Sequence, residues 1–232
     1  MKKTLLIITS LVFITSAVFP QSKVDIDNLI DIDGLLYKPN DDKPYTGKVF
    51  DLYDNAQKKF DGRYRNGLRN DKWTWWSEGG KMGSSGTYKN GIKNGKWTRW
   101  YENGQKKSEV TYKDGKENGL LTDWYENGQK KMEGTYNNGK QVGQWTYLLS
   151  NRHKWREGTF KDGIKDGKWT RWYDNGQMKQ EGTYKNHYEN GKWTFYYENG
   201  QIREDGNYKD GQQDGKWTYY NKDGSIKEVK EF

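Results

Sequence analysis

The sequence predicts an all-β protein: an elongated, single-sheet antiparallel β-meander solenoid built from 24-residue hairpin repeats. Three observations predict this fold. The chain repeats itself every 24 residues without insertion, each repeat holds two runs rich in Trp, Tyr and Thr, and Asn-Gly pairs separate these runs. A fixed short period is typical of repeat architectures, and Asn-Gly between two β-prone runs is typical of a hairpin.

The composition is that of an ordered protein without a thick globular core. Only 31% of the 232 residues are hydrophobic, which favours disorder, but 16% are aromatic, which opposes it. Forty basic and 32 acidic residues give a net charge of +8, a mixed pattern rather than the basic stripe of a nucleic-acid-binding protein. The chain has no Cys, which excludes disulfides, iron–sulfur clusters and Cys nucleophiles.

Residues 1–22 are predicted to be a secretory signal peptide. A basic start precedes an apolar run from Leu5 to Phe19, and polar residues follow. Cleavage is expected after Ala17 or nearer Gln21. The alternative is an uncleaved membrane anchor, for which a run of about 15 residues is short. We therefore expect an exported protein that is periplasmic, on the cell surface or secreted.

Eight repeats run from Gly47 to Phe232, and the last of them is truncated. We number positions 1 to 24 within each repeat. Position 1 is occupied by Gly47, Asp71, Gly95, Gly119, Gly143, Gly167, Gly191 and Gly215. Position 3 is Trp in six repeats, position 16 is Gly in six, and position 18 is aromatic in all eight. Residues 23–46 are predicted to form an N-terminal cap that covers the first strand edge. The acidic segment 25–34 lacks the ligand spacing of a calcium loop.

Asn-Gly at positions 9–10 predicts a two-residue type I′ turn, because both central residues of that turn need positive φ. This register pairs position 3 with 16, 4 with 15 and 6 with 13. One face then carries positions 3, 5, 7, 12, 14, 16 and 18, and the other carries 4, 6, 11, 13, 15 and 17. Each position-3 indole is expected to lie over the bare backbone of a position-16 Gly; a β-bulge at that Gly is the alternative. Since Val110 replaces one such Gly, we expect Trp97 to sit differently. The link from position 19 to the next repeat is predicted to be a turn of undetermined length.

The sequence predicts neither an enzyme nor a metal or cofactor site. His153 and His187, the only two histidines, occupy non-equivalent turn positions, which indicates drift between repeats. The acidic columns at positions 8 and 15 place the same carboxylate among lysines in repeat after repeat, whereas an acid/base pair needs two different environments. No catalytic residue is therefore proposed.

The best candidate binding surface is the row of aromatic residues at position 6, with cations expected opposite at position 13. We expect cation–π pairs of Trp100 with Lys107 and of Trp124 with Lys131, worth about 0.5–1 kcal/mol each. The candidate set is Trp76, Trp100, Trp124, Trp172, Tyr196, Tyr220, Lys107, Lys131, Lys179 and Arg203. If exposed, this row would suit a protein, a glycan or an anionic lipid surface. The alternative is that both aromatic rows only hold a thin sheet together.

Repeats 4 and 5, which begin at Gly119 and Gly143, depart from the others. The residues that break the pattern are Leu148, Leu149, Arg152 and Trp155. This break is either a local binding spot or neutral drift, and the sequence leaves both readings open.

Units such as WYENGQKKSEVTYKDGKENG and WYDNGQMKQEGTYKN resemble the MORN repeat variant found in many bacterial proteins. Segment 35–67 resembles the usual start of such arrays, many of which carry the name of a YwqK-type antitoxin family. The resemblance covers Leu35 to Phe232. It implies a β-sheet scaffold for protein–protein contacts, with phospholipid binding proposed for MORN arrays of other cells, and it carries over no catalytic residues.

These observations predict a non-enzymatic repeat scaffold that binds another protein at the cell envelope or outside the cell. A first alternative is a module that binds envelope glycans or anionic lipids. A second is an antitoxin-like inhibitor of a protein toxin, although a cytosolic toxin fits poorly with an exported chain. No specific nucleic-acid partner is expected, and the oligomeric state is left open.

Overall fold

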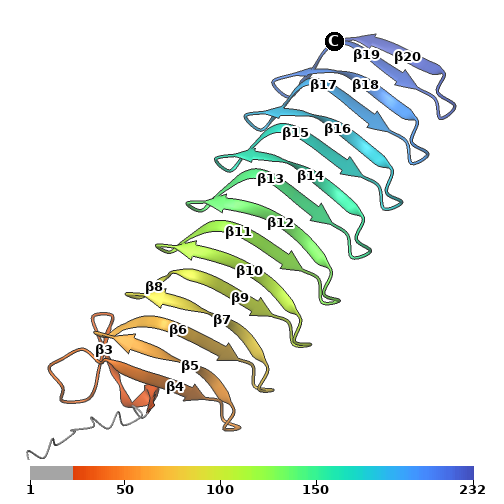
Figure 1. The fold of residues 1–232 in the computed structure, drawn as a ribbon. Coiled ribbons are helices and arrows are strands. Elements are labelled where there is room, and N and C mark those ends of the chain that lie inside the picture. Colours follow the sequence, from red (N-terminus) through yellow and green to blue (C-terminus); the bar gives the residue numbers. More distant parts are fainter. Residues whose placement is uncertain (1–22) are drawn as a thin grey trace, which may run out of the picture.

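The computed structural model describes residues 23–232, so the predicted signal peptide at 1–22 lies outside the described residues. Figure 1 shows an elongated ladder of antiparallel hairpins that follow one another in chain order. Within residues 23–232, eighteen strands form one sheet, and two further strands form a small separate sheet. The predicted β-meander solenoid is therefore confirmed. Among residues 23–232, no helix is long and apolar enough to cross a membrane.

Before the first repeat the chain forms β1 (Val24–Asp25), a 3-10 turn η1 (Ile26–Asn28), β2 (Ile30–Ile32) and β3 (Leu35–Tyr37). The repeat strands are β4 (Gly47–Leu52), β5 (Lys58–Arg65), β6 (Leu68–Trp76), β7 (Met82–Lys89), β8 (Ile92–Lys93), β9 (Gly95–Trp100), β10 (Lys106–Lys113), β11 (Lys116–Trp124), β12 (Lys130–Asn137), β13 (Lys140–Leu148), β14 (Lys154–Lys161), β15 (Ile164–Trp172), β16 (Met178–Lys185), β17 (Tyr188–Tyr196), β18 (Ile202–Lys209), β19 (Gln212–Tyr220) and β20 (Ile226–Glu231). β8 and β9 together correspond to one strand of the other repeats.

Two kinds of turn alternate along the chain: the Asn-Gly loop within each repeat and the turn that links one repeat to the next. The type I′ turn was predicted for the Asn-Gly loop, and this prediction is wrong. In the Asn-Gly loop, the Gly104 amide donates to the Tyr101 carbonyl at 2.9 Å, and the Tyr101 amide donates to the Gln105 carbonyl at 2.9 Å. Only Gly104 has positive φ there, at 83°. This is a three-residue loop that ends in a left-handed Gly. The type I′ geometry lies at the other end, where Asp114 and Gly115 both have positive φ.

The longer loop changes the pairing of one position. Trp97 pairs with Val110 and Thr98 with Glu109, as predicted for positions 3 with 16 and 4 with 15. The register then shifts, and Trp100 pairs with Lys106. A β-bulge therefore leaves position 13 without a direct partner, and the predicted pairing of positions 6 and 13 is wrong.

Side chains of the Asn-Gly loops tie each repeat to the next. The Tyr101 hydroxyl donates to the Trp124 carbonyl at 2.8 Å, and the Asn103 amide nitrogen donates to the Glu126 carbonyl at 2.7 Å. The same tyrosine bond recurs in four other repeats, from Tyr53, Tyr125, Tyr173 and Tyr197. A sheet of this kind has contacts only between neighbours, so these bonds hold the loops at a constant spacing.

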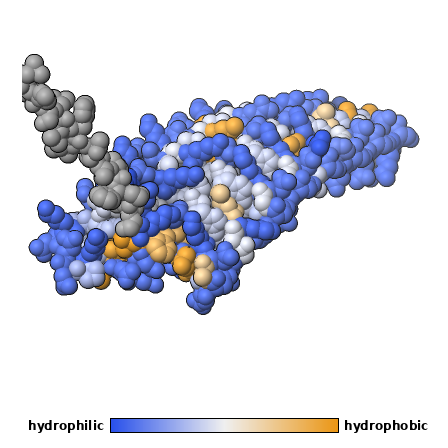
Figure 2. Space-filling view, turned by 60° about the horizontal axis from the view of Figure 1, so that its bottom comes forward, coloured by the Kyte–Doolittle hydropathy of each residue, from blue (hydrophilic) through white to orange (hydrophobic). Residues whose placement is uncertain are grey.

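Residues before the first repeat lie against its edge. Val24 and Asp25 pair in parallel with β4, and Leu29 and Tyr45 are buried in one cluster with Val49. Figure 2 shows that strongly hydrophobic residues are most concentrated at this end of the molecule, whereas a pale band of near-neutral residues runs along the sheet between hydrophilic margins.

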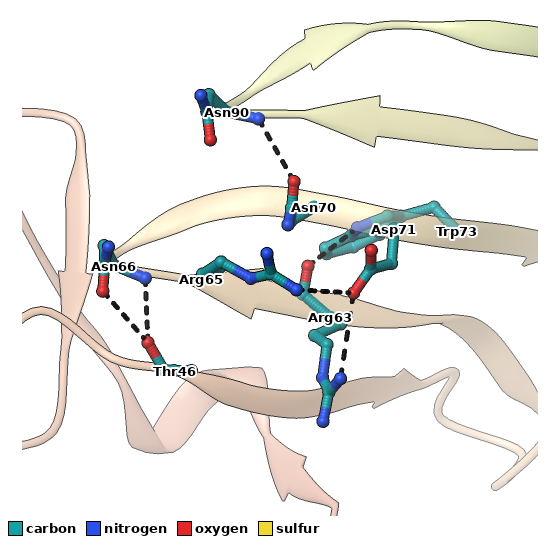
Figure 3. Close-up of polar contacts among 8 residues, drawn as sticks. All are labelled: Thr46, Arg63, Arg65, Asn66, Asn70, Asp71, Trp73 and Asn90. Atoms are coloured by element: carbon teal, nitrogen blue, oxygen red, sulfur yellow. Dashed lines mark hydrogen bonds and ion pairs between the residues drawn. The ribbon is translucent and has the colours of Figure 1, made fainter.

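Polar side chains link the N-terminal segment to the first repeat and the first repeat to the second, as Figure 3 shows. The backbone N–H of Asn66 donates to the Thr46 hydroxyl at 2.9 Å, and the backbone N–H of Asn90 donates to the side-chain oxygen of Asn70 at 3.3 Å. Asp71 occupies position 1, where most repeats have Gly, and adopts a φ of 60°. Its carboxylate lies 3.8 Å from the nearest guanidinium nitrogen of Arg63.

Candidate functional site

The pairing sorts the repeat positions into two faces of the sheet. Directly opposite residues share a face, and the face alternates along a strand. Positions 3, 5, 14, 16 and 18 lie on one face, which we call the Trp/Gly face. Positions 2, 4, 6, 12, 15 and 17 lie on the other, which we call the Thr/acid face. Position 12 was predicted on the first of these faces, and the bulge moves it to the second.

The Trp/Gly face is held by indoles that lie on glycine. Trp169 is 4% exposed and lies against Gly158 of the preceding repeat, not the Gly of its own hairpin. A Cβ on Gly158 would come within 2.1 Å of the Trp169 ring. The indole nitrogen donates to the Thr159 carbonyl at 3.0 Å. The predicted aromatic cover of glycine is therefore correct, but it joins neighbouring repeats.

Val110 is explained by its neighbour in the next repeat. Trp97 lies over Gly86, as its counterparts do over theirs, so the expectation that Trp97 sits differently is wrong. Val110 instead pairs with Leu121, the one residue at position 3 of the internal repeats that is not Trp. Both are buried in one cluster. The larger residue at position 16 is accommodated because the residue at position 3 is smaller.

The ten residues of the predicted binding set do not come together as one row. The aromatic residues at position 6 are half-buried on the Thr/acid face. The predicted pairs of Trp100 with Lys107 and of Trp124 with Lys131 are wrong, because position 12 supplies the cation: Lys106 lies over Trp124 at 5.6 Å. The position-13 cations lie elsewhere. Lys107, Lys131 and Lys179 lie over the position-7 rings Tyr101, Tyr125 and Tyr173, and Arg203 lies over Phe195 of the Trp/Gly face.

The Thr/acid face is repetitive, and its charges compensate one another. Glu109 accepts ion pairs from Lys96 at 2.6 Å and from Lys106 at 2.9 Å. Lys168 pairs with Glu181 at 2.8 Å, and its hydrogen bond lowers the pKa of that carboxyl. Such exposed pairs contribute at most about 1 kcal/mol each. Position 4 is Thr in seven repeats and position 15 is acidic in six, so this face presents nearly the same surface at each step.

Positions 5 and 14 form a row of a different kind on the Trp/Gly face, which we call the variable row. It crosses the sheet with one residue per strand, each directly paired with the next. From β4 to β20 it reads Asp51, Phe60, Trp75, Ser84, Arg99, Ser108, Asp123, Met132, Tyr147, Arg156, Arg171, Gln180, Phe195, Glu204, Tyr219 and Glu228. No two successive repeats share the same residue at position 5. Comparing the columns of the repeat would have revealed this row from the sequence.

The two histidines lie in different loops. The Nδ1 atom of His153 lies 2.9 Å from the Asp174 carbonyl oxygen in one loop. His187 occupies a type I′ turn at the opposite end of a hairpin, with a φ of 74°. Within residues 23–232, no group of three or more His, Asp or Glu side chains is arranged to hold a metal ion.

This geometry defines a β-hairpin repeat protein. The family model described as MORN repeat variant matches four of its segments, residues 93–114, 117–138, 165–186 and 189–210. The chain thus contains repeats of this MORN type. The comparison does not confirm the YwqK-type antitoxin assignment.

No curated protein matches the chain. One similar solved structure is a GtfA/B complex bound to UDP and GlcNAc, with 11% identity over 48% of this chain and 22% of that chain, at a TM-score of 0.22. Another is TcdB2-TccC3-Cdc42, with 13% identity over 79% of this chain and 12% of that chain, at a TM-score of 0.18. This chain thus spans less than a quarter of either, and neither likeness supports an inference about it.

Proposed function

We propose that this chain is a non-enzymatic scaffold that binds another protein along its Trp/Gly face. The variable row is the observation that carries the proposal. Positions that build the sheet repeat nearly unchanged, whereas the row beside the buried indoles presents a different side chain at almost every strand. A non-repeating line of charged, polar and aromatic groups suits recognition of one extended partner, which is how repeat proteins commonly use a face.

The inter-repeat bonds support this proposal energetically. Tyrosine and asparagine side chains of the loops fix each repeat on the next, and the indoles are locked against glycine. A surface that is ordered before binding loses little conformational entropy when the partner arrives. The matched MORN repeats are themselves of a type that commonly forms interaction modules.

The proposal includes export and a three-part organisation. Residues 1–22 would direct the chain to the envelope or the exterior, residues 23–46 would cap the array, and residues 47–232 would form the eight repeats. Fractionation of cells that express the full chain tests the location. Recovery of the protein in the cytosol would contradict export and would favour the antitoxin-like alternative.

Two adjacent residues provide a matched test of the binding face. Glu204 belongs to the variable row, and Asp205 points to the Thr/acid face, where it pairs with Lys192 at 3.2 Å. The full chain, Glu204→Lys and Asp205→Lys would each be used to capture proteins from envelope fractions. We expect a stoichiometric partner that Glu204→Lys loses and Asp205→Lys retains. Arg99→Glu and Lys96→Glu repeat the comparison four repeats away. If Glu204→Lys and Arg99→Glu capture the partner as well as the unaltered chain does, the proposal is contradicted.

A second candidate function is binding of an envelope glycan or an anionic lipid surface by the position-6 row. The half-buried indoles of this row, with Lys106 over Trp124 and Lys154 over Trp172, favour it. The test is binding to vesicles of anionic lipid and to isolated envelope glycans. We expect Trp100→Ala/Trp124→Ala to abolish binding if this function is correct and to leave protein capture unchanged if the scaffold is correct.

A further inference from the structure

The variable row contains one pair of like charges placed side by side. Arg156 on β14 is directly opposite Arg171 on β15. Every other charged residue of the row has uncharged neighbours on the adjacent strands. Like charges directly opposite each other in a sheet are destabilising, so the repulsion between these two guanidinium groups opposes folding.

A third cation lies in the same place. Lys165 lies with Arg156 and Arg171 along a hollow of about 180 Å³ whose other walls are Trp155, Trp169, Gln180 and Tyr184. Among the described residues, no acidic side chain lines it. Burial, and then the charge of Arg156, lower the pKa of Lys165. Glu189 is the acid that faces this group, and it accepts a hydrogen bond from the Tyr184 hydroxyl at 2.9 Å.

Aromatic rings hold the two guanidinium groups. Arg156 lies 4.1 Å from the ring centre of Tyr147 and 4.6 Å from that of Trp155, and Arg171 lies 5.8 Å from the Trp155 ring. Stacking on a ring leaves the N–H groups at the guanidinium edge free to donate in its plane. Among residues 23–232 neither arginine has an ion-pair partner, and the shielded Nε of each has no acceptor.

The flanks of the row limit the kind of anion that fits. Asp123 lies three strands from Arg156 on one side, and Glu204 lies three strands from Arg171 on the other. Each separation is about 14 Å at the usual strand spacing. A membrane surface or a nucleic acid, which carries negative charge along its whole length, would meet these carboxylates. A short acidic segment would not.

We propose that the hollow between Arg156, Lys165 and Arg171, which we call the cationic hollow, binds Asp or Glu carboxylates of a short acidic segment in a partner protein. Guanidinium groups bind carboxylates through paired N–H donors, and Trp155, 36% exposed, would cover the bound segment. This inference rests on the proposed scaffold function and specifies the chemistry of its partner.

The test uses the full chain and a fluorescein-labelled peptide, Gly-Glu-Asp-Glu-Gly, in anisotropy titrations at low salt. We expect Arg156→Gln and Arg171→Gln each to weaken binding about tenfold, the usual value of a hydrogen bond to a charged group. Lys168→Gln removes a cation of the same repeat as Arg171 from the Thr/acid face, where Lys168 pairs with Glu181 at 2.8 Å, and should change binding less than twofold. An uncharged peptide, Gly-Gln-Asn-Gln-Gly, should not bind.

A second readout separates binding from structure. Because the two arginines repel each other, the melting temperature of Arg171→Gln at low salt should not be lower than that of the parent chain. A lower melting temperature, or an equal loss of peptide binding in Lys168→Gln, would overturn the proposal. So would tighter, Arg171-dependent binding of anionic vesicles or of single-stranded DNA.

The scaffold function and the acidic-segment site can be refuted independently of each other. If envelope capture yields a partner that Glu204→Lys loses and Arg171→Gln keeps, the acidic-segment site is wrong and the scaffold stands. If no protein is captured but the peptide binds with the expected arginine dependence, the scaffold is wrong and the carboxylate site stands.

Discussion

The pairing of a small residue with an indole can be tested at Gly158. The change Gly158→Val places a side chain where its Cβ alone would come within 2.1 Å of the Trp169 ring. The indole must then leave its site. The same chain already contains the alternative solution, in which Val110 faces Leu121. We therefore expect Trp169→Leu to rescue Gly158→Val.

The magnitude follows from the area that the indole buries. Trp169 is nearly inaccessible, and a buried Trp removes roughly 150–250 Å² from water. At about 25 cal/mol per Å², expelling it costs up to about 4–6 kcal/mol, and about 1 kcal/mol more for the bond to Thr159. Since part of the ring can repack, we expect Gly158→Val to lower the free energy of unfolding by about 3–5 kcal/mol.

The assay is a double-mutant cycle in which urea unfolding is monitored by circular dichroism. Hydrogen exchange of β14 and β15 serves as a local readout. We expect Trp169→Leu alone to cost about 2–4 kcal/mol, and the double variant to be more stable than Gly158→Val, with a coupling energy of about 2–3 kcal/mol. The reciprocal cycle tests the natural pair: Leu121→Trp should destabilise alone and be tolerated with Val110→Gly. Additive effects in both cycles would refute the packing argument.

Three further predictions concern the turns and the hydrogen bonds. His187→Gly should raise the free energy of unfolding by about 0.5–1 kcal/mol, because His187 has a φ of 74° that Gly adopts more easily; a lower melting temperature would contradict this. Tyr125→Phe removes the 2.8 Å bond to the Leu148 carbonyl and should cost about 0.5–1.5 kcal/mol by urea unfolding, with increased exchange at that junction. Burial, together with the bond to Glu181, raises the pKa of Tyr196 to about 12, above its unfolded value near 10. The stability from this group is therefore complete below pH 10 and is lost as the pH rises toward 12, so Tyr196→Phe should flatten the pH dependence of unfolding in that range; an unchanged slope would exclude this contribution.

The positions of the lysines in the candidate site could not be predicted from the sequence. Trp100 and Lys107 were placed opposite each other on the assumption of a two-residue loop at Asn103-Gly104. The loop has three residues, and a one-residue change of register moves every following side chain to the other face until a bulge restores it. Lys106 therefore takes the place expected for Lys107 beside the indole row.

The all-β class, the 24-residue period and the indole-on-glycine packing follow from local sequence, because they depend on residue types that recur in every repeat and on pairings close in the chain. The turn types at the two hairpin ends do not. Asn-Gly and Asp-Gly both suit left-handed backbone, so the dipeptide by itself does not tell which pair closes a two-residue turn. The encounter of Arg156 with Arg171 also needed the tertiary structure. These residues lie in successive repeats. The face that a side chain occupies, and the residue that it meets on the next strand, depend on the register of the strands. The bulges set this register, and composition and periodicity leave it undetermined.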